Sequence, residues 1–188
     1  MLTLEHLAAL VETHRAAIPA RVPGFTLGGR SFDFNTRPAI MGVVNLSADS
    51  WYRESVCLTT KAAVRRGRQL AAQGADLVDL GAESTLAHAA RVDDASQTSR
   101  LLPILKELRA AGILVSVETY APAVTRACLA AGANLLNLTG TDHTAELFRL
   151  VADHDAAVIL CYVQGRNVRE VGDFDFHADP TASMHDYF

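Results

Sequence analysis

The stretch AIMGVVNLSADSW, residues 39–51, decides the fold class of this chain. It opens with an apolar run at residues 40–44, which follows a proline and is short enough to be a fully buried strand. The polar residues Asn45, Asp49 and Ser50 come directly after the run. A buried strand that ends in polar groups is how α/β folds commonly build a ligand site. The stretch therefore predicts a buried strand with a site at its end.

Four more segments follow the same design, and a helical pattern lies between each pair. Strands are expected at residues 40–44, 75–80, 113–117, 134–136 and 157–160, and helices at about 60–73, 93–110, 122 to the glycine at 132, and 145–153. Thr59 or Thr60 can cap the first helix, and Pro122 suits the first turn of the third. Pro103 lies inside the second helix and is expected to kink or shorten it. Alternation of buried strands with helices predicts a parallel sheet.

Two elements are expected before this series. An amphipathic helix over residues 3–18 can be capped by Thr3. A β-hairpin is expected around Gly28-Gly29, which separates two short alternating segments. At the other end of the chain, a possible helix begins at Pro180.

An open doubly wound sheet and a (β/α)8 barrel compete as architectures. Every strand here ends in polar residues, whereas an open sheet concentrates its site at one switch point, so the TIM-barrel type is favoured. A complete barrel has eight β/α units, of which about five are present. We expect an N-terminal helical extension over residues 1–24 and a barrel domain over 25–188 that is incomplete at its C-terminus. Since the outer strands would have open edges, we also expect a longer natural chain, a partner or a homodimer.

Composition excludes several classes of protein. A formal net charge of -4 over 188 residues argues against a bulk nucleic-acid binder. The three isolated cysteines indicate neither a zinc site nor a disulfide framework. No stretch approaches the roughly 18 apolar residues of a membrane span. We expect a cytoplasmic protein.

The polar residues at the strand ends form one candidate constellation. Its members are Asn45, Asp49, Glu83, Ser84, Thr85, Glu118, Thr119, Asn137, Thr139 and Gln164. Amides offer both a donor and an acceptor, and a carboxylate accepts two N–H bonds side by side, so the set suits a flat heterocycle. It contains no histidine pair and no base close to a serine, which disfavours nucleophilic and metal-hydrolase chemistry.

Four motifs resemble those of one family. Residues 40–51 resemble the first signature of the dihydropteroate synthases, I-M-G-(I/V)-(L/V)-N-x-(T/S)-P-D-S-F. Residues 74–85 resemble G-A-D-(I/L)-(I/V)-D-(I/V)-G-G-E-S-T, residues 116–120 resemble S-(I/V)-D-T-(Y/F), and residues 131–137 resemble A-G-A-x-(I/L)-(I/L)-N. The motifs occur in order and at matching intervals across about residues 25–170.

The resemblance implies a pterin-binding TIM barrel that joins p-aminobenzoate to 6-hydroxymethyl-dihydropterin pyrophosphate with the help of Mg²⁺. By position, Asn45 would lie on the pyrophosphate side as a catalytic residue and metal ligand. Asp49 and Ser50, also expected to be catalytic residues, would begin a mobile first loop that closes over the site. The pterin would be bound by Glu118, Asn137, Thr85 and Glu83, although Glu83 could equally order the turn after the second strand.

Several positions depart from the family pattern. Ala48 replaces the proline of the first signature, and Arg53 and Leu86 replace an aspartate and an arginine. Glu118 replaces the pterin-binding aspartate and moves the charge outward by about one methylene. The family's later Asp-Pro-Gly strand, lysine loop and Arg-x-His motif have no counterpart within these residues.

Three functions stay open at this stage. The first is a divergent transferase of the dihydropteroate synthase type. The second is a catalytically inactive pterin-binding homologue, which the changes at Arg53 and Leu86 favour. The third is a methyltetrahydrofolate–corrinoid methyltransferase-like protein, ranked last because the loop after Asn45 resembles the synthase more closely.

Overall fold

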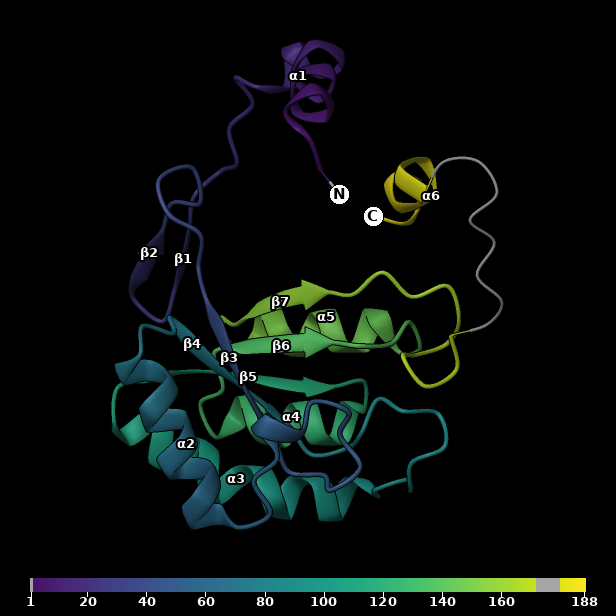
Figure 1. Cartoon of the computed structure of the whole chain (residues 1–188). Helices are drawn as coiled ribbons and strands as arrows, with labels where there is room; N and C mark the ends of the chain where they lie inside the picture. The colour runs from purple at the N-terminus through teal and green to yellow at the C-terminus, as the bar shows by residue number, and fades with distance from the viewer. Residues whose placement is uncertain (1, 172–179) are drawn as a thin grey trace. The chain divides into compact units, whose positions relative to one another are not determined.

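The computed structural model describes residues 2–171 and 180–188. The chain forms two compact units, one up to Ala39 and one over Ile40–Phe188 (Figure 1). The first unit contains both the N-terminal helix and the hairpin. The expected domain boundary after residue 24 stays a prediction.

The N-terminal helix α1 spans Leu4–Thr13. The backbone N–H of His6 donates to Oγ1 of Thr3 at 3.3 Å, which confirms the predicted cap. The prediction that the helix continues to residue 18 was wrong, because a short 3-10 helix over Arg15–Ala17 follows it. None of the residues of α1 is buried. The helix ends at the weak helix formers Thr13 and His14.

The predicted hairpin is confirmed. Strands β1, Phe25–Leu27, and β2, Arg30–Phe32, pair antiparallel. The two glycines between them have φ values of 55° and 79°, in the left-handed region that a two-residue turn of this kind requires. The rings of Phe25 and Phe32 stack with centroids 5.2 Å apart.

The second unit is built on a five-stranded parallel sheet. Its strands are β3, Met41–Asn45; β4, Leu77–Gly81; β5, Leu114–Thr119; β6, Leu135–Leu138; and β7, Ala157–Leu160. They lie in the order β3-β4-β5-β6-β7. This sequential order is that of a barrel wall and lacks the reversal that makes a switch point in a doubly wound sheet. The predicted α/β class with about five β/α units of a barrel is confirmed.

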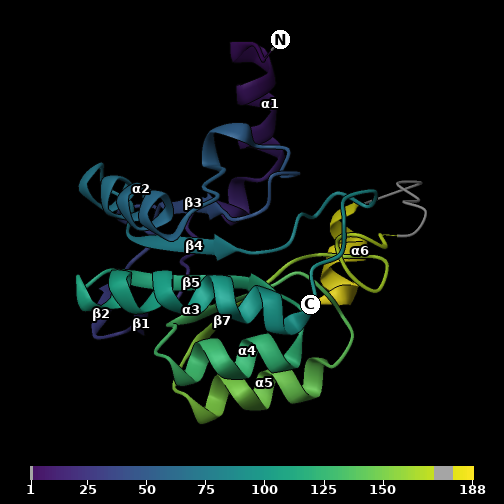
Figure 2. The same ribbon diagram turned by 90° about the horizontal axis from the view of Figure 1, so that it is seen from below.

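Four helices connect the strands. They are α2, Thr60–Ala72; α3, Asp94–Ala110; α4, Pro122–Ala130; and α5, Thr144–Asp153. Figures 1 and 2 show them along the sheet, with α3, α4 and α5 side by side. Thr59 caps α2, and Pro122 opens α4 at its first turn, as predicted. A final helix, α6, spans Pro180–Tyr187, as expected from Pro180.

Pro103 does not shorten α3. The helix runs through it without interruption, although a proline inside a helix costs about 3 kcal/mol. The compensation comes from packing, because Leu101, Ile104, Leu105 and Leu108 are almost completely buried. Burial of each such side chain contributes roughly 1.5–3 kcal/mol. Tertiary contacts therefore outweigh the local penalty that the sequence indicates.

The two faces of the sheet differ in chemistry because side chains alternate along a strand. Val44, Val78, Leu80, Val115 and Val117 belong to the hydrophobic core that includes the helices. The intervening positions, among them Asn45, Asp79, Ser116, Glu118 and Asn137, face the opposite side. In a complete barrel that side is the interior, and it carries the predicted site.

Candidate functional site

Four residues form a continuous row across the carboxyl ends of the strands. In the register of the sheet, Asn45 pairs with Gly81, Gly81 with Glu118, and Glu118 with Asn137. Three polar side chains predicted from separate motifs thus lie side by side on one face. Glu118 and Asn137 stand on neighbouring strands, roughly 4.8 Å apart, and Asn45 stands two strands from Glu118 with Gly81 between them.

Gly81 provides the space that the row needs. A β-carbon at this position would lie 3.0 Å from Oδ1 of Asn45 and even closer to Glu118. The side chains of Asn45 and Glu118 can therefore occupy the space above Gly81. The amide of Asn45 is oriented by Ser55, since its Nδ2 donates to Oγ of Ser55 at 2.7 Å. This bond directs Oδ1 of Asn45 toward the row.

Burial changes the protonation of Glu118. Removal from water raises the pKa of its carboxyl group to about 8, and the nearby carboxylates of Asp79 and Glu83 act in the same direction. Burial also raises the pKa of Asp79, while the polar groups of Ser116 and Asn137 lower it. At neutral pH the row therefore contains a protonated acid that can donate a hydrogen bond as well as accept one.

Glu83 is held by groups of the chain itself. Its Oε2 accepts a hydrogen bond of 2.7 Å from the Tyr120 hydroxyl, and its Oε1 accepts one of 3.0 Å from the backbone of Val92. Nη1 of Arg169 lies 3.7 Å from Oε1, and both side chains are buried. These contacts order the loop after β4, so Glu83 has a clear structural role here. Its predicted contact with a pterin stays a prediction.

Arg169 was missed by sequence reasoning. It is 6% exposed and donates to the backbone oxygens of Ser84, at 2.7 Å, and of Ala87 and Ala89. It thus ties the segment after β7 to the loop after β4. Its position 85 residues from Ser84 leaves no local signal in the sequence.

The first loop places its two predicted residues differently. Ser50 is 4% exposed and lines the strand-end cavity. Asp49 is exposed and does not line it. Its backbone oxygen accepts a hydrogen bond of 3.2 Å from Oγ of Ser84, which links the first and second loops.

A cavity of about 290 Å³ opens over the row. Six predicted site residues line it, namely Asn45, Ser50, Glu83, Thr85, Glu118 and Asn137. Trp51, Tyr52, Asp79, Met41 and Val43 complete the lining and were not among the predicted site residues. Trp51 is 75% exposed and offers an aromatic wall for a flat ligand. The size lies at the lower end of the range for small-molecule sites.

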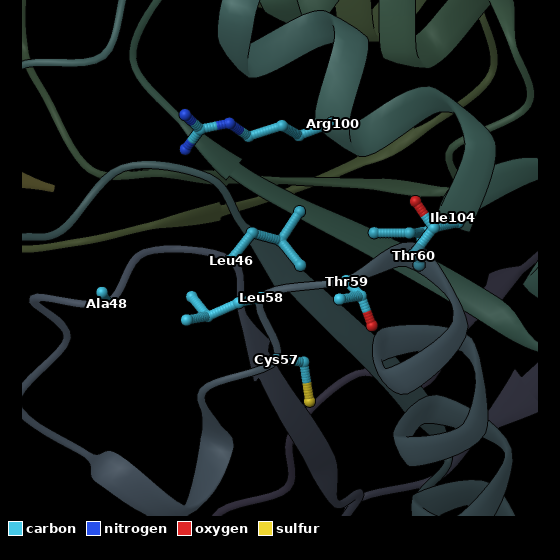
Figure 3. A pocket seen from close by; sticks show the side chains of 8 residues that line it. All are labelled: Leu46, Ala48, Cys57, Leu58, Thr59, Thr60, Arg100 and Ile104. Atoms are coloured by element: carbon cyan, nitrogen blue, oxygen red, sulfur yellow. The ribbon is translucent and has the colours of Figure 1, made fainter.

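A second cavity, of about 370 Å³, lies beside the first loop and α2 (Figure 3). Its lining includes Leu46, Cys57, Thr59 and Arg100. The Thr59 side chain already accepts from the backbone of Ala62 as the cap of α2. None of the predicted site residues lines this cavity, so we assign the site to the strand-end row.

The described part of the chain has neither a cluster of metal-binding side chains nor a helix that could span a membrane. Residues 2–171 and 180–188 contain no cluster of three or more histidine, cysteine, aspartate or glutamate side chains that could hold a metal ion. No helix among them is long and apolar enough to cross a membrane. The predicted metal ligand Asn45 is an amide at the end of the row.

Comparison with known proteins agrees with this geometry. The family described as pterin binding enzyme matches residues 41–185. Dihydropteroate synthase from Streptococcus pyogenes serotype M1 is 33% identical over 132 residues, which are 69% of this chain and 50% of that protein.

Two solved structures also resemble the chain. Dihydropteroate synthase from Burkholderia cenocepacia, complexed with 7,8-dihydropteroate, is 30% identical with a TM-score of 0.73, over 87% of this chain and 55% of that one. The enzyme from Thermus thermophilus, in complex with 4-aminobenzoate, is 33% identical with a TM-score of 0.62, over 75% of this chain and 49% of that one. The chain thus spans about half the length of these proteins. It belongs to the pterin-binding enzyme family, and its similarity within that family is to the dihydropteroate synthases.

Proposed function

We propose that this chain is part of a transferase of the dihydropteroate synthase type, which condenses p-aminobenzoate with 6-hydroxymethyl-dihydropterin pyrophosphate in folate biosynthesis. The observation that carries the proposal is the row of Asn45, Glu118 and Asn137 over a cavity of about 290 Å³. The row combines amide donors and acceptors with an acid, which are the groups that a pterin edge requires. Relatives of this chain carry the synthase name.

Glu118 and Asn137 are assigned to the pterin ring. Glu118, with a pKa raised to about 8 by burial, carries a proton at neutral pH and can both donate to and accept from the ring. Asn137 supplies an amide at the end of the row opposite Asn45. Trp51 and Tyr52 close the cavity from the first loop.

The proposed reaction is a displacement at the exocyclic carbon of the pterin. The amine nitrogen of p-aminobenzoate forms the new C–N bond, the C–O bond to pyrophosphate breaks, and the amine loses a proton. Because charge develops as pyrophosphate departs, groups held in place beforehand around the ring and the leaving group lower the barrier. The role of this chain's row is to bind and orient the pterin.

We also propose Mg²⁺ as the cofactor. The donor set fits an ion held mainly by the substrate, because Mg²⁺ commonly uses one or two protein oxygens together with phosphates. Oδ1 of Asn45 suits such a ligand, since the bond from Nδ2 to Ser55 leaves this oxygen facing the row. The ion would neutralise charge on the departing pyrophosphate.

The inactive pterin-binding homologue remains the alternative. Arg53 takes the position of an expected aspartate, and its Nη1 donates to the backbone oxygen of Ala48 at 2.6 Å. This contact joins two positions of the first loop, and both depart from the family motif. No observation on the described residues favours the methyltransferase alternative. The homodimer and the cytoplasmic location stay predictions.

Calorimetric titration of the chain with 6-hydroxymethyl-dihydropterin pyrophosphate tests the proposal. We expect saturable binding that Asn137→Leu weakens at least tenfold, which is the loss of one or two hydrogen bonds. The matched control, Asn35→Leu, removes an asparagine of the other compact unit and should leave binding unchanged. Absence of binding by the folded chain would contradict the assignment of the site. Release of pyrophosphate on addition of p-aminobenzoate separates the transferase from the inactive homologue.

A further inference from the structure

The amide of Asn137 is anchored from two strands away. Its Nδ2 donates a hydrogen bond of 3.1 Å to Oδ2 of Asp79. Asn137 lies on β6 and Asp79 on β4, so the bond crosses β5. Ser116 is the residue of β5 that pairs with Asp79, and its small side chain leaves room for this crossing.

The chemistry of Asp79 determines which end of the amide faces it. Oδ2 of Asp79 accepts when the group is ionised, and also when its proton is on Oδ1. In both states it binds the NH₂ end of Asn137. Oδ1 of Asn137 is then turned away, and its partner among the described residues is the thiol of Cys161 at 3.6 Å. A thiol is a weak donor, so this oxygen keeps accepting capacity for a ligand.

The buried carboxyl group of Asp79 lowers the stability of the folded state. It is 2% exposed, and its Oδ1 makes no hydrogen bond of good geometry in the described part of the chain, although the neighbouring Ser116 hydroxyl lowers its pKa. A buried polar atom without a partner costs about 1–3 kcal/mol. An apolar side chain of similar volume would avoid this cost, so packing alone does not account for a carboxyl group here.

We propose that Asp79 is a positioning residue for ligand recognition: it holds Asn137 with Oδ1 as an acceptor, so that the cavity selects a heterocycle whose edge donates N–H. This inference rests on the proposed function. The preferred ligand class is an aminopteridine; the corresponding 2-oxopteridine, which presents a carbonyl acceptor in place of the amino group and carries the added N–H on the adjacent ring nitrogen, binds more weakly. A fixed acceptor discriminates because the wrong ligand leaves it unpaired.

Asp79 also acts on Glu118 through charge. The carboxylates whose charge acts on Glu118 are those of Asp79 on β4 and Glu83 after β4. Asp79 raises the pKa of Glu118, in addition to the larger effect of burial.

The test compares pterin with lumazine, its 2-oxo analogue, by calorimetry on four proteins. Wild type should prefer pterin at least tenfold. Asp79→Leu removes the acceptor and lets the amide of Asn137 rotate, so affinity for pterin should fall about tenfold. The ratio of pterin affinity to lumazine affinity should then approach one. Asp79→Asn can still accept through its own amide oxygen, so it should keep the affinity within about threefold.

The control Asp153→Asn removes an exposed carboxylate from the end of α5 and should match wild type. A folded Asp79→Leu variant with wild-type preference would overturn the inference, as would an Asp79→Asn variant that loses the preference as fully as Asp79→Leu does. If Asp79→Leu fails to fold, Asp79→Ala takes its place in the comparison, with the same expected loss of preference for pterin over lumazine. Failure of wild type to bind pterin at all would instead contradict the proposed function.

Discussion

Oε2 of Glu118 lies 2.8 Å from the position that a β-carbon would take at Gly81. The glycine and the acid are register partners on β4 and β5, so the absence of a side chain at one position sets the location of the other. The binding row depends on this pair.

Gly81→Ala should therefore weaken pterin binding more than it weakens the fold. The new methyl group displaces the far end of a flexible side chain, so the free energy of unfolding should fall by about 1 kcal/mol or less. The displaced carboxyl should reduce affinity about tenfold. Calorimetry and urea unfolding measure the two effects.

Gly42→Ala is the matched control on the opposite face. Its methyl group would lie 3.0 Å from Cβ of Leu70 in α2. Overpacking there should cost about 1–3 kcal/mol of stability and leave affinity unchanged in the folded protein. Equal losses of affinity in the two variants would contradict the role given to Gly81.

Stability should fall as the pH rises through the titration of Glu118. Its carboxyl has a pKa of about 8 in the folded state, raised by burial, and about 4.3 in an unfolded chain. The folded state binds the proton more tightly, so its contribution is fully present below about pH 4.3 and is lost as the pH rises to about 8. We expect a loss on the order of 2 kcal/mol after allowance for partial exposure.

Urea unfolding between about pH 5 and about pH 8.5 spans this titration and measures the dependence. Glu118→Gln removes the titrating group. The difference in unfolding free energy between variant and wild type therefore separates the contribution of Glu118 from those of Asp79 and other acids. If this difference in unfolding free energy stays constant over the pH range, the pKa of Glu118 is the same in the folded and the unfolded chain.

Arg169→Met should destabilise the chain strongly. It removes the hydrogen bonds to the loop after β4 and leaves the buried Glu83 without its cation. Breaking one side of a buried ion pair costs about 3–5 kcal/mol. Urea unfolding gives the loss, and limited proteolysis should show earlier cleavage between residues 85 and 92. Arg169→Lys keeps the charge but not the planar fork, so its loss should be smaller.

Tyr120→Phe should cost about 1–3 kcal/mol of unfolding free energy, because Glu83 loses its hydrogen bond of 2.7 Å in a buried setting. Tyr187→Phe is a suitable control. Its hydroxyl donates to the backbone oxygen of Cys161 at 3.0 Å from an exposed position, where the loss should be within about 0.5 kcal/mol. A loss of similar size in both variants would argue against the structural role of the Tyr120–Glu83 contact.

The sequence predicts much of this fold because its signals are local. Strand β7 begins and ends where the apolar run indicated, and Thr59, Pro122 and the glycines after the helices mark their ends. Pro103 does not shorten α3, contrary to that half of the prediction, because the packing that keeps the helix continuous comes from other elements.

The main residues of the site were predictable from the sequence because they follow directly after predicted strands. Asn45, Glu118 and Asn137 stand at strand ends, and parallel strands bring their ends to one edge. The supporting contacts were not predictable, because Asp79 and Asn137 are 58 residues apart and Arg169 and Ser84 are 85 apart. Such pairs follow from the register of the sheet and from loop paths, which no local pattern encodes.

The strands lie in the sheet in the same order as in the chain. Each new β/α unit therefore meets its partner strand at the growing edge, and none of the described strands has to enter between two others. During synthesis from the N-terminus, we expect the sheet to extend one strand at a time. The row is complete only when β6 joins, because Asn137 is its last polar member. Ligand affinity should therefore arise late in folding, after most of the core has formed.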